Sequence, residues 1–189
     1  MGRRFFTSDW HLWDDSLRPY LHLRTQWTHD EFAQMIHDRF NEVVKDGDIT
    51  YVLGDVTRLP SNKENWIRFK DFVDSLNGTK YLIRGNHDEW SNEDYLDCGF
   101  DRVECVRRLD IMGDKIFLVH DPAWFQPVND CKICVCGHVH NLFEQIWDLN
   151  NRRVYNVSLD CRGYGPASFS LKNPFFHIKS LFNEEGLIK

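Results

Sequence analysis

The chain has 189 residues, of which 42% are hydrophobic and 28% charged, and its formal net charge is −6. This length suits one domain with a sizeable core, and the acidic balance, with basic residues at most in pairs, argues against tight binding to duplex nucleic acid. No apolar stretch reaches the roughly 18 residues of a membrane span, and no apolar signal-peptide core is present. We therefore expect a single cytoplasmic domain over residues 1–189 that binds no membrane.

Two amphipathic helices separated by short strands are predicted in the first half of the chain. Thr28 and Glu31 form a capping box, and apolar residues at helical spacing behind it predict a helix over residues 29–45. Ser61 and Glu64 form a second capping box, which we expect to begin the next helix. Short apolar runs predict the strands, at residues 5–7, 49–53 and 80–83.

The second half of the chain is predicted to consist mostly of strands. Short apolar runs alternate there with Gly, Asp and Asn, at residues 103–106, 116–119, 133–136, 143–147 and 154–157. We therefore expect one α/β domain whose sheets pack as layers with helices outside. An apolar tail begins at about residue 163, and the sequence does not decide whether it caps the core or contacts a second copy of the chain.

The cysteines favour core packing over metal binding. Cys131, Cys134 and Cys136 lie close together, but the run Ile133-Cys134-Val135-Cys136 is typical of a buried strand, and buried thiols behave as small hydrophobic groups. No second cysteine pair stands at zinc-finger spacing. With no secretion signal among the residues, disulfides are not expected either.

Most of the functional information lies in four short motifs and one isolated histidine. Each of the later motifs follows an apolar, strand-like run, and ligand sites of α/β sheets gather beyond the carboxyl ends of strands. Carboxylate, amide and imidazole groups without thiolates suit Zn, Mn, Fe, Ni or Co. The motifs are Asp9-Trp10-His11, Gly54-Asp55, Gly85-Asn86-His87-Asp88 and Gly137-His138-Val139-His140, with His120 between the last two.

The spacing within the motifs suggests how metals would be shared. Asp9 and His11 are two residues apart, so on an extended segment both side chains point to the same side and can share one metal. His138 and His140 repeat this spacing. Asp55 has two carboxylate oxygens and can bridge two cations. Two divalent cations bring +4 against −2 from the two aspartates, which leaves a positive pocket that attracts phosphate.

The remaining motif residues have candidate catalytic and substrate-binding roles. Asn86 can add an amide oxygen without adding charge, while His87 is left free as a general acid that Asp88 could orient by hydrogen bonding. Arg84 and Arg58 adjoin the motifs, and either guanidinium could bind a phosphate oxygen, although a surface or packing role is the alternative. Tryptophans near the motifs either wall the pocket or anchor its loops, namely Trp10, Trp90 and Trp124.

The order of these motifs resembles the calcineurin-like metallophosphoesterase superfamily over about residues 5–160, and is most similar to its small single-domain bacterial and phage members. The resemblance implies a four-layer α/β arrangement, in which a two-sheet β-sandwich is flanked by helices. It also implies the ligand sets: Asp9, His11 and His140 for the first metal, Asn86, His120 and His138 for the second, Asp55 as the bridge, and His87 as the group that protonates the leaving oxygen.

The sequence also departs from that family. Trp13-Asp14 stands where close relatives often carry Gly-His, so Asp14 is expected to alter the substrate side of the pocket. Asp121 replaces a common aromatic residue after the isolated histidine. The segment from Gly54 to Leu59 is only partly similar to the motif of the protein phosphatases, which puts protein phosphatase activity in doubt.

The expected function is therefore metal-dependent hydrolysis of a phosphodiester or phosphomonoester through a metal-bridging hydroxide, with His87 as general acid. Two divalent ions are expected, with Mn²⁺ favoured and Zn²⁺, Fe²⁺/Fe³⁺, Ni²⁺ or Co²⁺ as alternatives. The expected partner is a small phosphorylated molecule, with nucleotides among the candidates, and the oligomeric state is open. The alternative is a non-catalytic protein-binding scaffold of the same fold, although all seven ligands and His87 are present.

Overall fold

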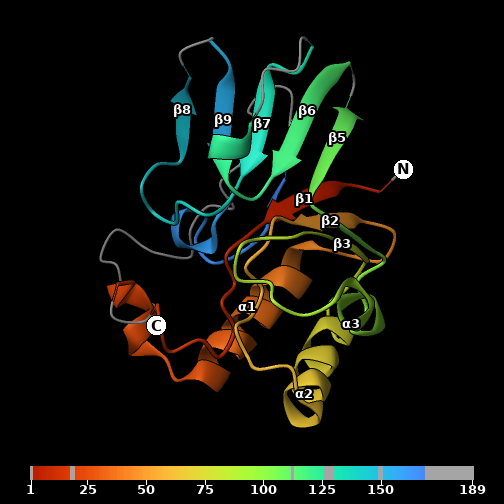
Figure 1. Cartoon of the computed structure of the whole chain (residues 1–189), viewed down its shortest axis with the longest axis vertical. Helices are drawn as coiled ribbons and strands as arrows, with labels where there is room; N and C mark the ends of the chain where they lie inside the picture. Colours follow the sequence, from red (N-terminus) through yellow and green to blue (C-terminus); the bar gives the residue numbers. More distant parts are fainter. Residues whose placement is uncertain (1, 18–19, 112, 126–129, 149–150, 169–189) are drawn as a thin grey trace.

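The computed structural model describes residues 2–17, 20–111, 113–125, 130–148 and 151–168, and within the first short helix the side chains of residues 22 and 23 are not described. Two five-stranded sheets make up the centre of the molecule (Figure 1). The first has the order β10-β1-β2-β3-β4, with bounds Ala167–Ser168, Arg4–Thr7, Ile49–Val52, Thr79–Ile83 and Arg102–Glu104. The second has the order β5-β6-β7-β9-β8, with bounds Val106–Ile111, Asp114–Val119, Ile133–Cys136, Arg153–Asn156 and Gln145–Trp147.

Both sheets have parallel centres. Strands β1 to β4 run parallel, and β10 is antiparallel to β1. Strands β6, β7 and β9 are likewise parallel, with β5 and β8 antiparallel at the two edges. Because the carboxyl ends of parallel strands meet at one edge of a sheet, the loops that leave them are brought together.

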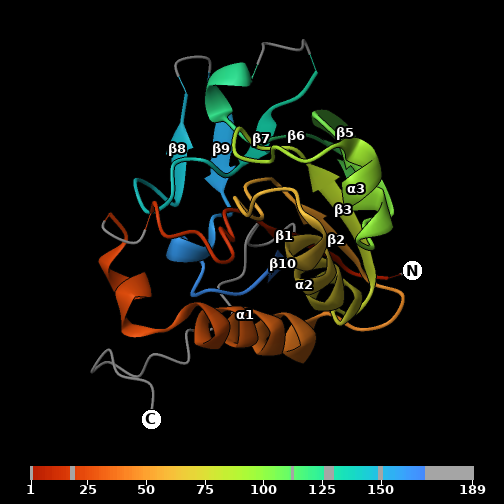
Figure 2. The ribbon, with the colours of Figure 1, turned by 60° about the horizontal axis from the view of Figure 1, so that its bottom comes forward.

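Three α-helices lie beside the first sheet, with bounds α1 His29–Val43, α2 Lys63–Asp74 and α3 Asn92–Asp97 (Figure 1, Figure 2). Short 3-10 helices complete the described elements: η1 His22–Gln26, η2 Pro122–Trp124 and η3 Leu159–Cys161. Helices, strands and layers together confirm the expected α/β sandwich of two sheets flanked by helices. None of the helices in the described ranges is long and apolar enough to cross a membrane.

The described residues form three apolar clusters. The first joins the helices to the first sheet, through residues such as Ile36 of α1 and Phe69 of α2. The second fills the space between the sheets and includes Leu53 and Ile116. The third lies on the other face of the second sheet, because alternate residues of a strand point to opposite faces, and it includes Phe117. Cys131, Cys134 and Cys136 are buried in this third cluster, which confirms their expected core packing.

The first helix matches its predicted capping box, whereas the second does not. Thr28 and Glu31 form both hydrogen bonds of the box. The second helix is capped by Asn62, whose side chain accepts a hydrogen bond of 3.0 Å from the Asn65 backbone N–H, so the predicted box of Ser61 and Glu64 is wrong. An amide oxygen one residue later takes the capping role, and the helix begins at Lys63.

One predicted strand is divided in the structure, and one helix was not predicted. The run 103–106 splits at Cys105 between β4 and β5, which belong to different sheets. Helix α3 has only six residues, too few for a periodic apolar pattern, although Ser91 and Asp94 form a capping box at its start. Most of the apolar tail falls beyond residue 168 and lies outside the described residues.

Candidate metal centre

The predicted ligands lie in loops at the carboxyl ends of strands, as expected from the sequence. Backbone hydrogen bonds join these loops: the Asp9 N–H donates to the Gly54 carbonyl at 2.9 Å, and the His11 N–H donates to the Asp55 carbonyl at 2.9 Å. The loops follow β1, β2, β3, β6 and β7 and carry Asp9, Asp55, Asn86, His120 and His138, respectively. The fold thus gathers side chains that are more than 100 residues apart in sequence.

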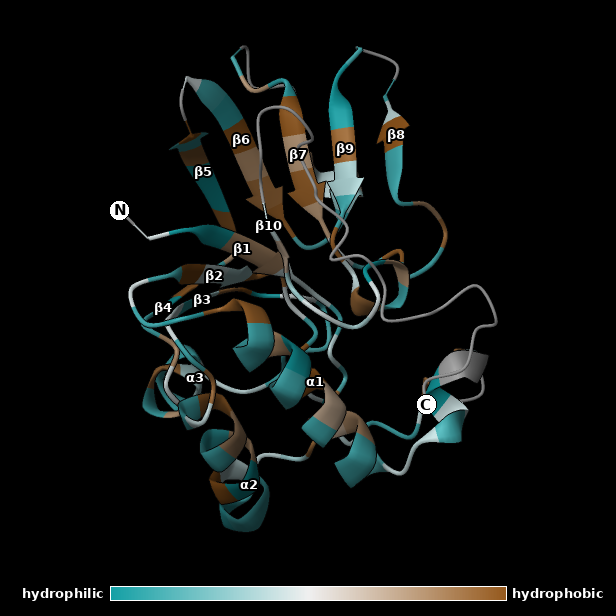
Figure 3. Cartoon of the chain, turned by 180° about the vertical axis from the view of Figure 1, so that it is seen from behind, coloured by the Kyte–Doolittle hydropathy of each residue, from teal (hydrophilic) through white to brown (hydrophobic). Residues whose placement is uncertain are grey.

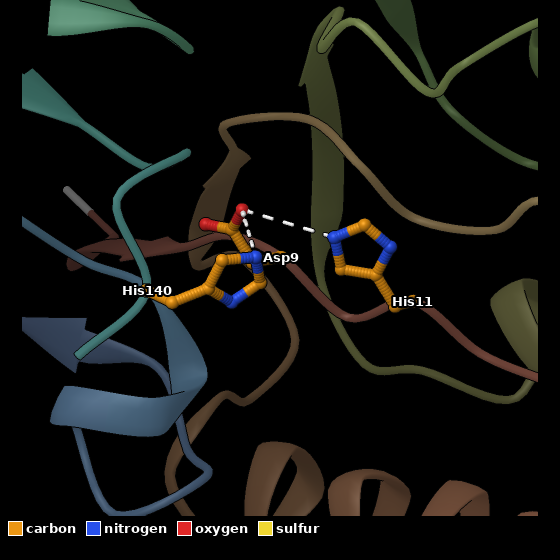
Figure 4. A group of neighbouring side chains, drawn as sticks. All are labelled: Asp9, His11 and His140. Atoms are coloured by element: carbon orange, nitrogen blue, oxygen red, sulfur yellow. Dashed lines mark ion pairs between the residues drawn. The ribbon is translucent and has the colours of Figure 1, made fainter. Parts of the chain in front are cut away.

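One group of donor atoms comes from Asp9, His11 and His140, whose ligand atoms lie within 4.8 Å of one another. Asp9 Oδ1 lies 4.0 Å from His11 Nε2 and 3.8 Å from His140 Nε2 (Figure 4). Both imidazoles therefore approach one oxygen of the same carboxylate. A carboxylate and two imidazoles are suitable ligands for one transition-metal cation.

The second group comes from Asp55, His120 and His138. Asp55 Oδ2 lies 3.2 Å from His120 Nε2. Asn86 belongs with this group, because its Oδ1 lies 3.1 Å from His120 Nε2 and 3.0 Å from His138 Nδ1. Asp55 Oδ2 also lies 3.4 Å from His11 Nε2, so a single carboxylate oxygen links the two groups.

The chemistry of the donor set fits divalent cations. His11 Nε2 is buried and lacks a hydrogen-bond partner among the described residues. A buried polar atom without a partner is costly and calls for a physical reason. This nitrogen points to the carboxylates of Asp9 and Asp55 at 4.0 and 3.4 Å, where a cation would take the place of the missing hydrogen bond.

In three of the histidines predicted to be ligands, the ring nitrogen that faces away from the donor group lies beside a hydrogen-bond acceptor. His11 Nδ1 lies 3.1 Å from Asp14 Oδ2, and His140 Nδ1 lies 2.8 Å from Asp160 Oδ2. His120 Nδ1 lies 2.6 Å from the Leu53 carbonyl oxygen. Such acceptors fix the tautomer and leave Nε2 facing the site. Asp14 is buried, and its carboxylate contacts the ring nitrogen of His11 that faces away from Asp9 and Asp55.

The carboxylates set the charge of the neighbouring imidazoles. Burial disfavours the imidazolium of His120, but the hydrogen bond to Asp55 and the charges of Asp9 and Asp55 outweigh it and raise the pKa of His120 to about 9. Burial likewise opposes the raised pKa of His11, which the contacts with Asp14 and Asp55 bring about. Burial would raise the pKa of Asp55, but hydrogen bonds from the two imidazoles lower it far below its usual range.

The backbone of the site is unusual. Among the described residues eight non-glycine positions have positive φ, and five of them are predicted ligands: Asp9 (58°), His11 (43°), Asp55 (55°), His138 (70°) and His140 (46°). The extended geometry expected for the two-residue spacings is therefore wrong. Such left-handed backbone is uncommon for non-glycine residues and concentrates at functional sites, where the surrounding structure supports its cost.

His87 lies beside the first donor group, but Asp88 does not orient it. The half-buried ring of His87 packs against the His11 ring with centroids 5.6 Å apart, and its backbone N–H donates to Asp55 Oδ1 at 2.9 Å. The carboxylate of Asp88 is buried and accepts the backbone N–H groups of Asp55, Val56 and Gly85 at 2.9, 2.9 and 2.7 Å. Asp88 therefore joins two ligand loops.

The two arginines have different surroundings. Arg84 donates to Asn92 Oδ1 at 2.8 Å and to the carbonyls of Asp88 and Trp90, so its guanidinium braces the loop after β3. Arg58 is exposed and donates to Ser16 Oγ at 2.9 Å. Burial is the main cause that lowers the pKa of His87, and the charge of Arg58 adds to it. Of the two, Arg58 is the one that acts electrostatically on His87.

Sequence reasoning missed a buried ion pair behind the first donor group. Arg24 binds both oxygens of Asp160, at 2.9 and 2.7 Å, and also donates to the carbonyl of Asp9 at 2.7 Å. Asp160 in turn holds His140. Arg24 and Asp160 are 136 residues apart, and no local pattern connects them. The only sequence signal is that an aspartate ends the segment Asn156-Val157-Ser158-Leu159-Asp160.

Comparison with known proteins agrees with this geometry. The family profile described as calcineurin-like phosphoesterase matches residues 2–142. An uncharacterised protein of Methanocaldococcus jannaschii is 31% identical over 144 residues, 75% of this chain and 73% of that protein. A protein of unknown function from Aquifex aeolicus has the same fold with a TM-score of 0.66 at 23% identity, over 89% of this chain and 96% of that one. An archaeal phosphodiesterase has a TM-score of 0.55 at 16% identity, over 93% and 98%. The chain belongs to the calcineurin-like phosphoesterase family.

Proposed function

We propose that this protein hydrolyses small phosphodiesters or phosphomonoesters with two divalent metal ions, Mn²⁺ being the favoured ion. The observation that carries the proposal is the position of Asp55, whose Oδ2 lies 3.4 Å from His11 Nε2 and 3.2 Å from His120 Nε2. One carboxylate oxygen thus adjoins both donor groups. That is the arrangement a ligand shared by two cations requires.

The donor groups divide between the two ions. Asp9, His11 and His140 would hold one ion, Asn86, His120 and His138 would hold the other, and Asp55 would contact both. When bound, the two cations supply Lewis-acid activation of water and neutralisation of phosphoryl charge. Asp14, Asp160 and the Leu53 carbonyl keep the imidazoles in the tautomer that can bind.

His87 is proposed to protonate the leaving oxygen. Its backbone N–H is fixed by Asp55, and its ring lies against His11 at the edge of the first donor group. Burial lowers the pKa of His87, which makes the imidazolium a better proton donor. Arg58 is proposed to attract the phosphate, since its guanidinium is exposed and its charge already acts on His87.

Metal-dependent turnover is the test of this proposal. Metal-stripped protein would be assayed on bis-p-nitrophenyl phosphate and p-nitrophenyl phosphate, with and without added Mn²⁺, beside Asp55→Asn. The matched control is Asp46→Asn, which changes an exposed turn aspartate remote from the donor groups. We expect Mn²⁺ to restore turnover in the wild type and the control but not in Asp55→Asn. Bound metal without turnover of either substrate would instead favour a scaffold.

The general acid can be tested through the leaving group. His87→Ala should lower the rate by about 10²–10⁴-fold for an alkyl ester, whose leaving oxygen needs a proton. The loss should be smaller for p-nitrophenolate, which departs without one. His37→Ala, a half-buried histidine on α1, is the control and should leave both rates unchanged. Equal losses on both substrates would rule out His87 as the acid.

A further inference from the structure

An apolar cavity adjoins the second donor group. Its volume is about 560 Å³, within the range of about 300–1,000 Å³ that is common for ligand pockets. Asn86, His120 and His138 line one side of it. The other walls are mainly apolar and are formed by Cys105, Val106, Phe117, Val119 and Trp124. A molecule bound at the second donor group would therefore extend directly into an apolar space.

The cavity follows from the alternation of side chains on β6. Ile116 and Leu118 point into the core between the sheets, while Phe117 and Val119 belong to the cluster on the other face. Figure 3 shows that β7 is apolar and that β6 is apolar after its polar first residues. The three α-helices lie beside the first sheet, so that other face of the second sheet has only η2 among the described helices (Figure 1). Phe117 and Val119 are thus left to form a pocket floor.

Trp124 forms an exposed wall of this cavity. Its side chain on η2 is 68% exposed, although tryptophan is the largest apolar side chain. Trp10 and Trp90 differ, since both are buried and their ring N–H groups donate to Thr7 Oγ1 at 3.1 Å and to the Leu59 carbonyl at 2.8 Å. Those two tryptophans anchor loops, whereas Trp124 presents an aromatic face that a flat apolar group can cover.

Away from the second donor group, the described lining of the cavity leaves no cationic side chain free to bind an anionic arm. Among the described residues that line the cavity, Asp121 is the one carboxylate, and its Oδ2 lies 4.0 Å from His138 Nε2. Arg84 is the one arginine in the described part of the lining, and its guanidinium already donates to Asn92 and to two carbonyls. Beyond the donor group itself, an anionic arm in the cavity would face Asp121, and no side chain of the described lining is free to pair with that arm. The occupant that fits is neutral and aromatic.

The position of His87 indicates which part of a substrate fills the cavity. His87 packs against His11 in the first donor group and is not part of the cavity lining. In hydrolysis of a diester, water adds to phosphorus, the bond from phosphorus to the leaving oxygen breaks, and that oxygen takes a proton. The leaving arm must therefore lie toward the acid, whereas the arm that stays on the monoester product can lie in the cavity.

We propose that the cavity beside Asn86, His120 and His138 binds the retained arm of a phosphodiester, and that this arm is neutral and aromatic, as an aryl group or a nucleoside is. This inference rests on the proposed function and narrows its substrate class to diesters with such an arm. Trp124 packs on the aromatic ring, and Phe117 and Val119 form the floor beneath it.

Kinetics with matched substrates test the inference. Phenyl p-nitrophenyl phosphate, methyl p-nitrophenyl phosphate and p-nitrophenyl phosphate have the same leaving group and differ only in the retained arm. Trp124→Ala should lower kcat/KM about tenfold for the phenyl diester and less than twofold for the other two. Trp147→Ala is the control, because Trp147 is 58% exposed and lies on β8, away from the cavity. Equal losses on all three substrates, or no loss on the phenyl diester, would overturn the inference.

A second measurement is independent of turnover. Cys105 lines the cavity and is the one exposed cysteine of the six, so a methanethiosulfonate reagent should label it fastest, and Cys105→Ser should lose that fast phase. With Mn²⁺ present, phenyl phosphate, the product of the phenyl diester, should slow the labelling at least fivefold, whereas methyl phosphate should not. Protection without turnover would overturn the proposed function but support binding of an aromatic group in the cavity. Turnover without protection would overturn only the assignment of the cavity to the retained arm.

Discussion

Single acceptor groups behind the donor groups orient the imidazoles that we propose as ligands. Asp14 and Asp160 accept from the outer nitrogens of His11 and His140, and the Leu53 carbonyl does so for His120. Acceptors of this kind orient metal ligands, and their loss commonly costs 10–100-fold in metal affinity. The carboxylate of Asp88 acts less directly, because the hydrogen bonds that it accepts come from backbone N–H groups of the loops.

Asp88→Asn should therefore shift the loops that carry the proposed ligands. It should not affect proton transfer from His87. The amide has one acceptor oxygen instead of two, so at least one buried backbone N–H loses its bond, at a cost of about 1–3 kcal/mol. We expect weaker Mn²⁺ binding by calorimetry and rate losses of the same size for alkyl and p-nitrophenyl leaving groups. A larger loss for alkyl esters would mean that Asp88 assists His87 after all.

A matched control exists for this variant. Asp48 is also buried and accepts two backbone N–H groups, from Arg3 at 2.8 Å and Lys45 at 2.9 Å, but it lies away from the donor groups. Asp48→Asn should lower the thermal midpoint without changing the affinity for Mn²⁺. Equal effects of both variants on metal binding would show that general destabilisation, rather than loop position, governs the site.

The elements of the fold bring the site together by their loops. Parallel strands end at the same edges of the two sheets, and each ligand follows within a few residues of such an end. Glycines let these loops approach one another. A side chain at Gly85 would collide with the carboxylate and backbone of Asp55, and one at Gly137 would collide with Ser8. The close contact between loops therefore depends on the absence of a Cβ atom.

Gly85→Ala tests this dependence. The added methyl group would displace Asp55, the residue that adjoins both donor groups, so we expect Mn²⁺ affinity and turnover to fall by at least tenfold. Gly113→Ala is the control, since nothing lies within 4 Å of the added atom and only its positive φ of 88° makes the change costly, by about 1 kcal/mol. Calorimetry and circular dichroism measure both effects. Unchanged metal binding in Gly85→Ala would show that the loops can separate without harm.

The sequence was informative wherever the determining pattern was local. Helical spacing and a capping box predicted α1 to within two residues at its end, and strand ends predicted where the ligands gather. The two-residue spacing gave a wrong backbone prediction, because Asp9 and His11 adopt left-handed conformations rather than those of an extended strand. The prediction of one strand over 103–106 was wrong because the chain passes from one sheet to the other at Cys105. That crossing depends on tertiary packing and has no local sequence pattern.

At the scale of the whole molecule, an ion pair between distant parts of the chain supports the candidate metal centre. Arg24 precedes α1, Asp160 lies in η3, and their ion pair is buried on both sides. Burial would raise the pKa of Asp160, but His140 and Arg24 lower it to about 2, so the carboxylate stays ionised. Sequence could not predict this pair, because its formation depends on the packing of the two sheets and α1.

The charges of the donor groups predict how pH acts on the whole protein. Without metal, His120 has a pKa of about 9 in the folded chain against 6.5 as its ordinary value. Its imidazolium then stabilises the fold fully below about pH 6.5, and this contribution is lost as pH rises through about 9. His11 shifts in the same direction. The lowered pKa of His87 acts below pH 6.5 and leaves this window unaffected.

Metal binding should show the opposite dependence, because a cation competes with the proton for the same imidazole nitrogen. Between pH 6.5 and 9 we expect the metal-free protein to lose on the order of 1–3 kcal/mol of stability, while the rise in thermal midpoint on adding Mn²⁺ grows. Thermal unfolding at several pH values, with chelator or with Mn²⁺, measures both trends. A Mn²⁺ effect that is constant with pH would contradict this prediction. It would mean that His120 is neutral before the metal binds and that the nearby carboxylates do not raise its pKa.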